Sequence, residues 1–307
     1  MAPAALAGLH ATHNDEVGRA WIAELPALAE SCLDRWQLRL DGPPGHGMAS
    51  LVLPVLCPDG VPAALKLQPV DDENVGEAVG LRAWDGNGAV RLLDEDPSTG
   101  ALLLERLEAD RPLSSVPNDM EALRILAELL GRLVALPAPA GLRRLSDIAA
   151  RMLDQVPYAL TILHRDIDRR LVAACAGVVR DLLPESGDRL LHWDLHYDNI
   201  LGGQREPWLA IDPKPLAGDP GFELLPALVN RWDDVVATGD IARAVCRRFD
   251  LLVDVLALDR PRAVGWTLGR VLQNTLWEVE DGGTEVDGIQ VAIAEALVGS
   301  RALPDGL

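Results

Sequence analysis

The chain has 307 residues, of which 49% are hydrophobic and 24% are charged, values that fit a globular enzyme of one or two domains. Its formal net charge of −19 disfavours nucleic acid as a partner and suits a cationic ligand, although so acidic a surface could serve solubility alone. The four cysteines form no C-x-x-C pair, and no stretch is typical of a signal peptide or a membrane span. We therefore expect a cytoplasmic, monomeric protein with reduced thiols.

Hydrophobic periodicity first predicts a helix and then two strands, at residues 15–34, 36–40 and 51–55. The turn-rich segment 41–50 lies between these strands. In it, Gly45 and Gly47 match the first part of a glycine-rich phosphate-binding loop, and Ser50 stands in place of its third glycine. Ser50 is therefore a candidate phosphate contact, while a plain hairpin loop explains the same residues equally well.

A lysine stands in the middle of the next apolar strand, 63–67, where a charge is costly unless it is paired. This strand resembles the Val-Ala-Ile-Lys strand of kinases, which implies that Lys66 holds the α- and β-phosphates of a nucleotide. A helix is predicted at 73–84, and Glu77 within it is the expected ion-pair partner of Lys66. Glu73, one turn earlier, is the alternative partner.

Two more strands are expected, at 90–94 and 101–105. The second leads into Glu105 and Leu107, which occupy the place of the hinge that joins the two lobes of a kinase. Backbone groups of the hinge usually bind adenine, so these two residues are candidates for the nucleotide site through their main chain.

Beyond residue 107 the apolar residues recur at helical spacing, and Asn118 followed by Glu121 resembles a capping box. Further helices are predicted near 144–158, 165–183, 223–237, 240–257, 261–281 and 285–299. A β-rich first third followed by a helical remainder predicts two lobes. We place a nucleotide-binding lobe at 1–106 and a helical lobe with the catalytic loop and substrate site at 107–307.

Residues 190–215, LLHWDLHYDNILGGQREPWLAIDPKP, combine short apolar strands with three polar side chains, Asp194, Asn199 and Asp212. Asp194 and Asn199 have the spacing of the protein-kinase catalytic loop, and Asp212 follows a strand, as the metal-binding Asp of kinases does. Phosphoryl transfer requires a carboxylate to accept the proton of the attacking hydroxyl, and an amide and a carboxylate to hold Mg²⁺. We predict Asp194 as the base and Asn199 and Asp212 as Mg²⁺ ligands. A hairpin whose polar residues only cap turns is the alternative.

Three neighbouring side chains have other expected roles. His192 is expected to pack behind the loop, whereas His196 is a candidate substrate contact. Lys214 either reaches a phosphate or points to water, and we expect the second.

Several stretches, among them HWDLHYDN, EPWLAIDPKPLAGDPGFELLPAL, RRFDLL, GWTLGRVLQNTLWEVEDG and RAWIAELPAL, resemble the aminoglycoside phosphotransferases. Within this family the chain looks most like the enzymes that phosphorylate the 6-hydroxyl of streptomycin. The resemblance implies an α+β, bilobal protein-kinase-like fold, use of ATP with Mg²⁺, and a role for Asp219 in steadying the catalytic loop. A turn or helix cap is the alternative role for Asp219. Asp212 is followed by Pro-Lys-Pro and not by Phe-Gly, which argues against a protein kinase.

Streptomycin carries guanidinium groups, so its site should offer carboxylates and aromatic faces. Two stretches have this composition. The first contains Trp232 and Asp233. In the second, four side chains share one face of a predicted helix: Asn274, Trp277, Glu278 and Asp281. A solvated acidic helix end is the alternative for the second stretch.

Two further hypotheses remain open. The acceptor could be another hydroxylated amine or a small molecule such as hydroxyurea, because the phosphate-site residues are the same for any acceptor. The chain could also bind a nucleotide without turnover, although Lys66, Asp194, Asn199 and Asp212 together argue against this.

Overall fold

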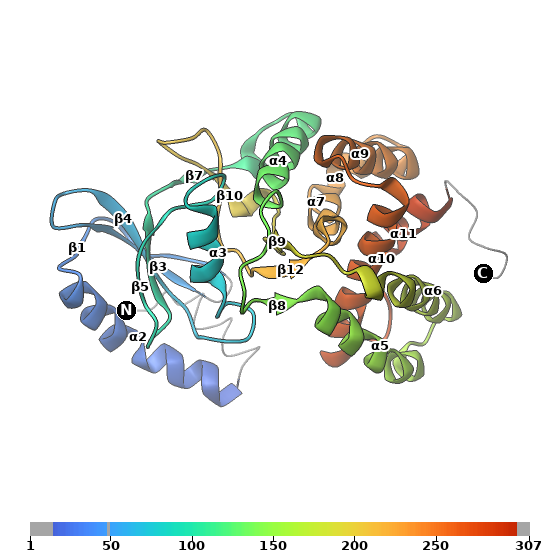
Figure 1. The fold of residues 1–307 in the computed structure, drawn as a ribbon, viewed down its shortest axis with the longest axis horizontal. Helices are drawn as coiled ribbons and strands as arrows, with labels where there is room; N and C mark the ends of the chain where they lie inside the picture. The colour runs from blue at the N-terminus through green and yellow to red at the C-terminus, as the bar shows by residue number, and fades with distance from the viewer. Residues whose placement is uncertain (1–14, 48–49, 300–307) are drawn as a thin grey trace.

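The computed structural model describes residues 15–47 and 50–299, which form a sheet-rich N-terminal part and a larger helical C-terminal part (Figure 1). The predicted α+β, bilobal fold class is confirmed. The N-terminal sheet has six strands: β1 (Arg39–Leu40), β2 (Gly45–His46), β3 (Leu51–Leu56), β4 (Pro62–Leu67), β5 (Leu92–Asp96) and β6 (Ala101–Glu105). Its order is β1-β3-β4-β6-β5, with β2 paired to β3, and every pair is antiparallel.

Successive side chains along each strand point to opposite faces of this sheet, and the two faces pack against different elements. Helix α2 (Asp15–Arg35) covers one face, where Leu25 and Cys32 pack on Leu53 and Leu65 in a separate small core. Lys66 follows Leu65 on β4 and therefore points to the opposite face. That face is turned toward helix α3 and the C-terminal part (Figure 1).

Helix α3 (Glu77–Trp84) starts later than the predicted 73–84, because residues 72–76 form turns. The side chain of Asp71 caps these turns, accepting hydrogen bonds from the backbone N–H of Glu73 and Asn74 at 2.8 and 2.9 Å. Glu77 thus stands in the first helical turn, directly beneath the sheet.

The C-terminal part contains α4 (Asp119–Leu133), α5 (Leu145–Ile162), α6 (Asp166–Leu182), α7 (Leu224–Val229), α8 (Trp232–Ala237), α9 (Ile241–Leu256), α10 (Arg260–Glu280) and α11 (Gly288–Gly299). The prediction of a single helix at 223–237 is wrong, because this segment forms two helices, α7 and α8. It breaks between α7 and α8, where Arg231 adopts a left-handed conformation with φ 55°. The Asn118 side chain accepts from the N–H of Glu121 at 3.0 Å and begins α4, as its capping pattern predicts.

The C-terminal part also contains two small three-stranded sheets. Their strands are β7 (Glu108–Pro112), β8 (Arg143–Arg144), β9 (Arg189–Leu191), β10 (Ile200–Gly202), β11 (Leu209–Ala210) and β12 (Leu216–Gly218). The orders are β11-β10-β7 and β8-β12-β9. The N–H of Val90, just before β5, donates to the C=O of Ala210 on β11 at 2.8 Å, so backbone hydrogen bonding crosses from one lobe to the other.

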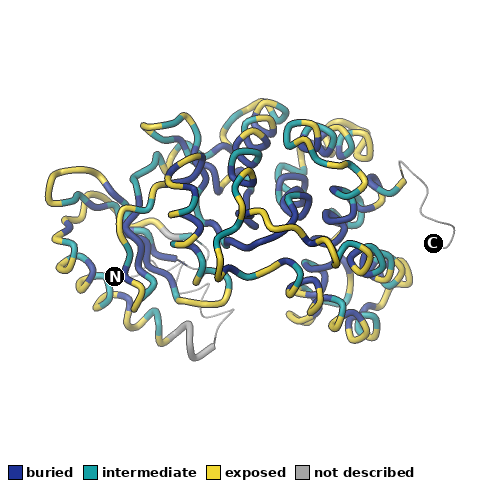
Figure 2. Tube along the Cα trace, in the orientation of Figure 1, coloured by how far each residue is buried: buried dark blue, intermediate teal, exposed yellow. Residues whose placement is uncertain are grey.

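The main hydrophobic core also continues across the lobes. Leu81 and Trp84 of α3 and Leu104 of β6 belong to the same buried cluster as the C-terminal helices, and Figure 2 shows the buried trace running through the middle of the molecule.

The four cysteines are free thiols. Within residues 15–47 and 50–299, no helix combines the length and apolar character that a membrane crossing requires.

Candidate active site

The central hairpin, residues 190–215, brings together the three side chains predicted to carry phosphoryl transfer. The N–H of Ile211 donates to the C=O of Asn199 at 2.9 Å, which places Asn199 beside Asp212 at one end of the β10–β11 ladder. Asn199 Nδ2 in turn donates to the backbone oxygen of Asp194 at 2.9 Å. Residues separated in sequence therefore converge on one spot.

Behind Asp194 lies a fully buried imidazole. His192 Nδ1 accepts from the N–H of Asp194 at 3.4 Å, and His192 Nε2 lies 3.0 Å from the C=O of Ile211. Burial lowers the pKa of His192 to about 3, so the ring is neutral and carries its proton on Nε2. His192 accordingly orients the loop, and only Asp194, with 28% of its side chain exposed, is available to a substrate hydroxyl.

A buried carboxyl group also supports this loop. Trp193 adopts a left-handed conformation with φ 68°, and its N–H donates to Glu223 Oε1 at 2.7 Å. The family resemblance implied that Asp219 steadies the loop, with a turn or helix cap as the alternative, and the structure supports the alternative. Asp219 accepts from the N–H of Gly221 at 2.8 Å and pairs with Arg262 at 2.5 Å, so it is a helix cap. Glu223, four residues later, makes the contact instead.

Glu223 makes protein stability depend on pH. Burial raises its pKa from 4.5 to about 7, so the folded state binds this proton more tightly than the unfolded chain. The stabilisation from the protonated form is complete below about pH 4.5 and is lost as the pH rises through about 7. We expect the free energy of unfolding of Glu223→Gln, minus that of the wild type, to grow by on the order of 2–3 kcal/mol between pH 5 and pH 8. Urea unfolding at both pH values measures this, and a constant difference would contradict it.

The ion pair predicted between Lys66 and Glu77 is present in the structure. Lys66 Nζ lies 2.7 and 2.8 Å from the two carboxylate oxygens of Glu77, and Gln68 also donates to Glu77. Lys66 contacts Asp212 as well. Burial alone would lower the pKa of Lys66, but Asp212 and Glu77 raise it above its ordinary value, and Lys66 lowers the pKa of Asp212. Glu73 is not the partner of this lysine.

The donor set at the end of the hairpin fits Mg²⁺, which prefers hard oxygen ligands. Asn199 uses its Nδ2 as a donor to the backbone, which leaves its Oδ1 as the group that can face an ion. Asp212 adopts a left-handed conformation with φ 57° and keeps 39% of its side chain exposed. These two residues would hold the metal, which would neutralise phosphate charge.

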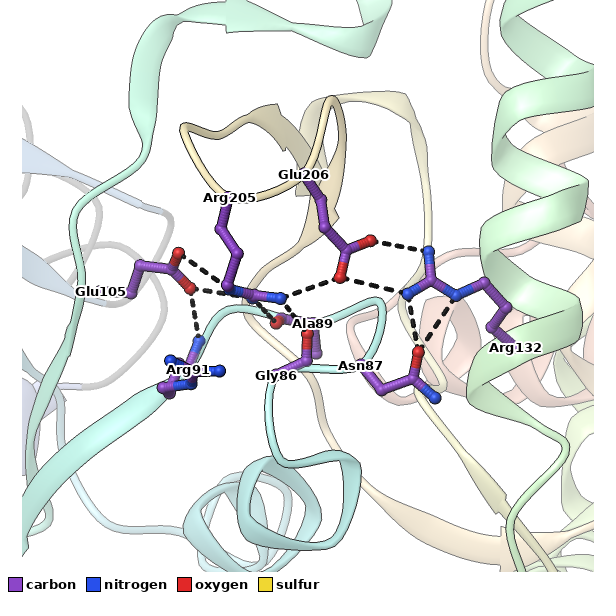
Figure 3. Close-up of polar contacts among 8 residues, drawn as sticks. All are labelled: Gly86, Asn87, Ala89, Arg91, Glu105, Arg132, Arg205 and Glu206. Carbon is purple, nitrogen blue, oxygen red and sulfur yellow. Dashed lines mark hydrogen bonds and ion pairs between the residues drawn. The ribbon is translucent and has the colours of Figure 1, made fainter.

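The candidate hinge residue Glu105 is held by the turn of the central hairpin (Figure 3). Glu105 forms an ion pair with Arg205, whose Nη2 lies 3.0 Å from Glu105 Oε2, and the adjacent Glu206 pairs with Arg132 of α4 at 2.8 Å. The carboxylate of Glu105 is therefore occupied by protein contacts, and Leu107 packs against the main core. Only the backbone of these two residues is left as a candidate adenine contact.

Ser50 lies at the start of β3 and is 5% exposed. The N–H of Gly47 donates to its backbone oxygen at 3.0 Å, and β2 pairs antiparallel with β3. Residues 48–49, between the two strands, lie outside the described residues.

Next to Asp194 is a cavity of about 490 Å³. Its lining comes from both lobes: Glu73, Trp193, Asp194, Lys214, Arg270, Trp277, Glu280 and Asp281. Four of these residues are carboxylates and two are cations. The rings of Trp193 and Trp277 lie 5.8 Å apart, and Arg270 Cζ is 5.0 and 5.6 Å from them. Burial lowers the pKa of Arg270 to about 10, which still leaves it charged at neutral pH.

The predicted substrate face of α10 is only partly turned toward this cavity. Trp277 and Asp281 line it, but Asn274 donates to Gln290 of α11 at 3.1 Å and Glu278 accepts from the same Gln290 at 3.4 Å. Docking of α11 thus takes up one flank of the helix. Glu280, on the flank away from Glu278, and Arg270, two helical turns before Trp277 on the same stripe, also line the cavity. The sequence analysis missed both residues.

The other substrate candidates do not line this cavity. Trp232 packs against the main core and Asp233 is exposed on α8. His196 accepts from the N–H of Asp198 at 3.3 Å and caps the short helical turn 197–199.

A bilobal fold with a buried lysine–glutamate pair, a hairpin that presents Asp194, Asn199 and Asp212, and an acidic cavity beside them defines the class of small-molecule phosphotransferases with a kinase-like fold. The family model described as "Aminoglycoside/hydroxyurea antibiotic resistance kinase" matches residues 35–282. The chain belongs to this family.

Three comparisons illustrate the relationship. The chain is 57% identical to a streptomycin 6-kinase of Streptomyces glaucescens, with 97% of each chain covered. It is 53% identical to a hydroxyurea phosphotransferase of Kitasatospora aureofaciens, covering 97% of this chain and 86% of that one. A solved aminoglycoside phosphotransferase, APH(4)-Ia in a ternary complex with AMP-PNP and hygromycin B, shares the fold with a TM-score of 0.60 at 17% identity, covering 90% and 99% of the two chains.

Proposed function

We propose that this protein is a streptomycin 6-kinase that transfers the γ-phosphoryl group of ATP to the 6-hydroxyl of streptomycin and so confers resistance. The observation that carries the proposal is the 57% identity to a streptomycin 6-kinase over 97% of both chains. The acidic, tryptophan-lined cavity beside Asp194 supports it, because guanidinium groups bind carboxylates and aromatic faces.

The roles of the site residues follow from their positions. Asp194 accepts the proton of the acceptor hydroxyl, and Lys66 binds the α- and β-phosphates once the nucleotide is present. Asn199 and Asp212 hold Mg²⁺. We place the boundary between the nucleotide-binding and acceptor-binding lobes after residue 106, because the chain leaves the six-stranded sheet at Glu105.

Hydroxyurea is the second candidate acceptor, and the 53% identity to a hydroxyurea phosphotransferase favours it. The cavity argues for the larger substrate. Its volume of about 490 Å³ is within the range of sites for drug-sized ligands, and its excess of carboxylates offers nothing specific to an uncharged acceptor.

An acceptor screen with γ-labelled ATP separates the two candidates. We expect labelled product with streptomycin, and kcat/KM for hydroxyurea lower by at least about 10²-fold, since each lost charged contact contributes about 1.5–3 kcal/mol. Labelling of hydroxyurea with equal or greater efficiency would overturn streptomycin as the substrate. Nuclear magnetic resonance of the product then identifies the phosphorylated hydroxyl.

Two carboxylates of the cavity should determine the affinity for streptomycin. We expect Asp281→Asn and Glu280→Gln each to raise the KM for streptomycin by about ten- to a hundredfold, because a well-placed charged hydrogen bond contributes about 1.5–3 kcal/mol. The KM for ATP should change little. Glu278→Gln and Asp233→Asn are matched controls, since neither residue lines the cavity. A larger effect from the controls than from the two cavity variants would place the streptomycin site elsewhere.

A further inference from the structure

The backbone around Lys214 is conformationally restricted. Lys214 lies between Pro213 and Pro215, which fix their own φ angles and restrict the residue before each of them. Its N–H donates to the C=O of His192 at 3.0 Å. Pro215 packs so closely on α3 that a Cβ at Gly80 would lie 2.5 Å from Pro215 Cγ. This rigid backbone fixes the position from which the Lys214 side chain extends.

The side chain of Lys214 does not point simply to water, contrary to our expectation from the sequence. Its Nζ lies 3.5 Å from Asp194 Oδ2 and 3.3 Å from Glu73 Oε2, with 37% of the side chain exposed. These carboxylates come from the catalytic loop and from the turns before α3. These two carboxylates lie within ion-pairing distance and stabilise the charged form of the ammonium group at the cavity wall.

The place of this charge relative to the reaction is specific. The acceptor hydroxyl must bind Asp194, and the nucleotide phosphates must bind on the side of Asp212 and Lys66, so the transferred phosphoryl group passes between them. Lys66 is already paired with Glu77 and Asp212. Arg270, the other cation of the cavity, stacks against tryptophan rings. Among the described residues, Lys214 is the cation that forms an ion pair with Asp194.

We propose that Lys214 binds the γ-phosphoryl group of ATP during transfer, and that Asp194 and Glu73 hold its ammonium group in place while the site is empty. In the transfer, the bond from the γ-phosphorus to the β–γ bridging oxygen breaks and its electron pair leaves with ADP. A bond forms from the acceptor oxygen to phosphorus, and the hydroxyl proton moves to Asp194. Lys214 exchanges no proton; its charge offsets that of the phosphoryl oxygens. This inference rests on the proposed kinase function.

The test is nucleotide binding in the absence of any acceptor, measured by calorimetry with Mg²⁺. For Lys214→Met, we expect the Kd of AMP-PNP to rise by about tenfold or more, while the Kd of ADP stays within about twofold. The reason is that only AMP-PNP carries a γ-phosphoryl group. Lys214→Arg, which keeps the charge, should retain most of the preference for AMP-PNP. Equal losses for both nucleotides, or no loss for either, would overturn the proposal.

Glu73→Gln is the matched control for a purely structural role. It removes one ion pair of Lys214 but no contact with the γ-phosphoryl group, so we expect the ratio of the two Kd values to stay near that of the wild type. If Glu73→Gln reproduced the Lys214→Met result, Lys214 would only tie Glu73 to Asp194, and the inference would be wrong.

Turnover gives a second readout. With streptomycin, Lys214→Met should lose about 10²-fold or more in kcat, because the transferred phosphoryl group loses a stabilising charge. The KM for streptomycin should not rise, because a cation does not bind the guanidinium groups of this substrate. A wild type that binds AMP-PNP but does not phosphorylate streptomycin would contradict the proposed acceptor. The binding comparison at Lys214 would still decide the inference.

Discussion

Asp194→Asn is expected to lower kcat by about 10²–10⁴-fold, the usual range for loss of a general base. The amide has the shape of the carboxylate but cannot accept the hydroxyl proton. The support behind the loop does not depend on the charge of Asp194, since His192 and Asn199 contact its backbone. Binding of ATP should therefore survive. Steady-state kinetics with streptomycin and nucleotide titration measure both quantities.

Asp198→Asn provides the matched control in the same loop. Asp198 has 61% of its side chain exposed and accepts from Ser114, and it does not line the cavity. Its substitution should leave kcat within about threefold of the wild type. Near-normal turnover by Asp194→Asn, or an equal loss in both variants, would remove Asp194 as the base.

Asp212→Asn is expected to cost at least about 10³-fold in kcat/KM for ATP. A carboxylate that holds the metal contributes several kcal/mol of charge stabilisation, and each 1.36 kcal/mol is a factor of ten. The Mg²⁺ concentration that gives half-maximal activity should rise as well, because the amide is a weaker ligand for a hard cation. A Mg²⁺ titration of activity checks the assignment.

The complication is that Asp212 also pairs with Lys66, so the variant loses two contacts at once. Glu77→Gln separates them, because Glu77 is the other carboxylate partner of Lys66 and both of its oxygens are occupied by Lys66 and Gln68. We expect this control to raise the KM for ATP while the Mg²⁺ requirement stays unchanged. A Mg²⁺ titration of Asp212→Asn that overlaid that of the wild type would mean that Asp212 is only a turn residue.

Much of the nucleotide side of the site could be predicted from the sequence because its signals are local. Alternation along 63–67 places Lys66 on the face opposite Leu65, and Glu77 follows in the first helix after the strand. The spacing of Asp194 and Asn199, with Asp212 after a strand, requires only a short hairpin to bring them together. Each of these inferences depends on the period of one element or on one tight turn.

The acceptor side was not predictable in the same way. Helical periodicity grouped Trp277 with Glu278 and Asp281, but the packing of Gln290 from α11 turns Glu278 away from the cavity. The flank that carries Glu280 faces the cavity instead. Periodicity defines which residues share a face, whereas the neighbouring helix decides which flank of that face remains open.

The sequence by itself determined the division into a sheet-rich and a helical part, the lysine–glutamate pair and the polar residues of the central hairpin, since all of these follow from short-range patterns of apolar and polar residues. Only the tertiary structure decided that Glu223 and not Asp219 supports the loop, and that Lys214 lies between Asp194 and Glu73. The physical reason is that such contacts join segments far apart in the chain. The Glu223 and Asp194 contacts are set by packing within the C-terminal lobe, and the Glu73 contact by how the two lobes pack on one core. No local pattern records either kind of packing.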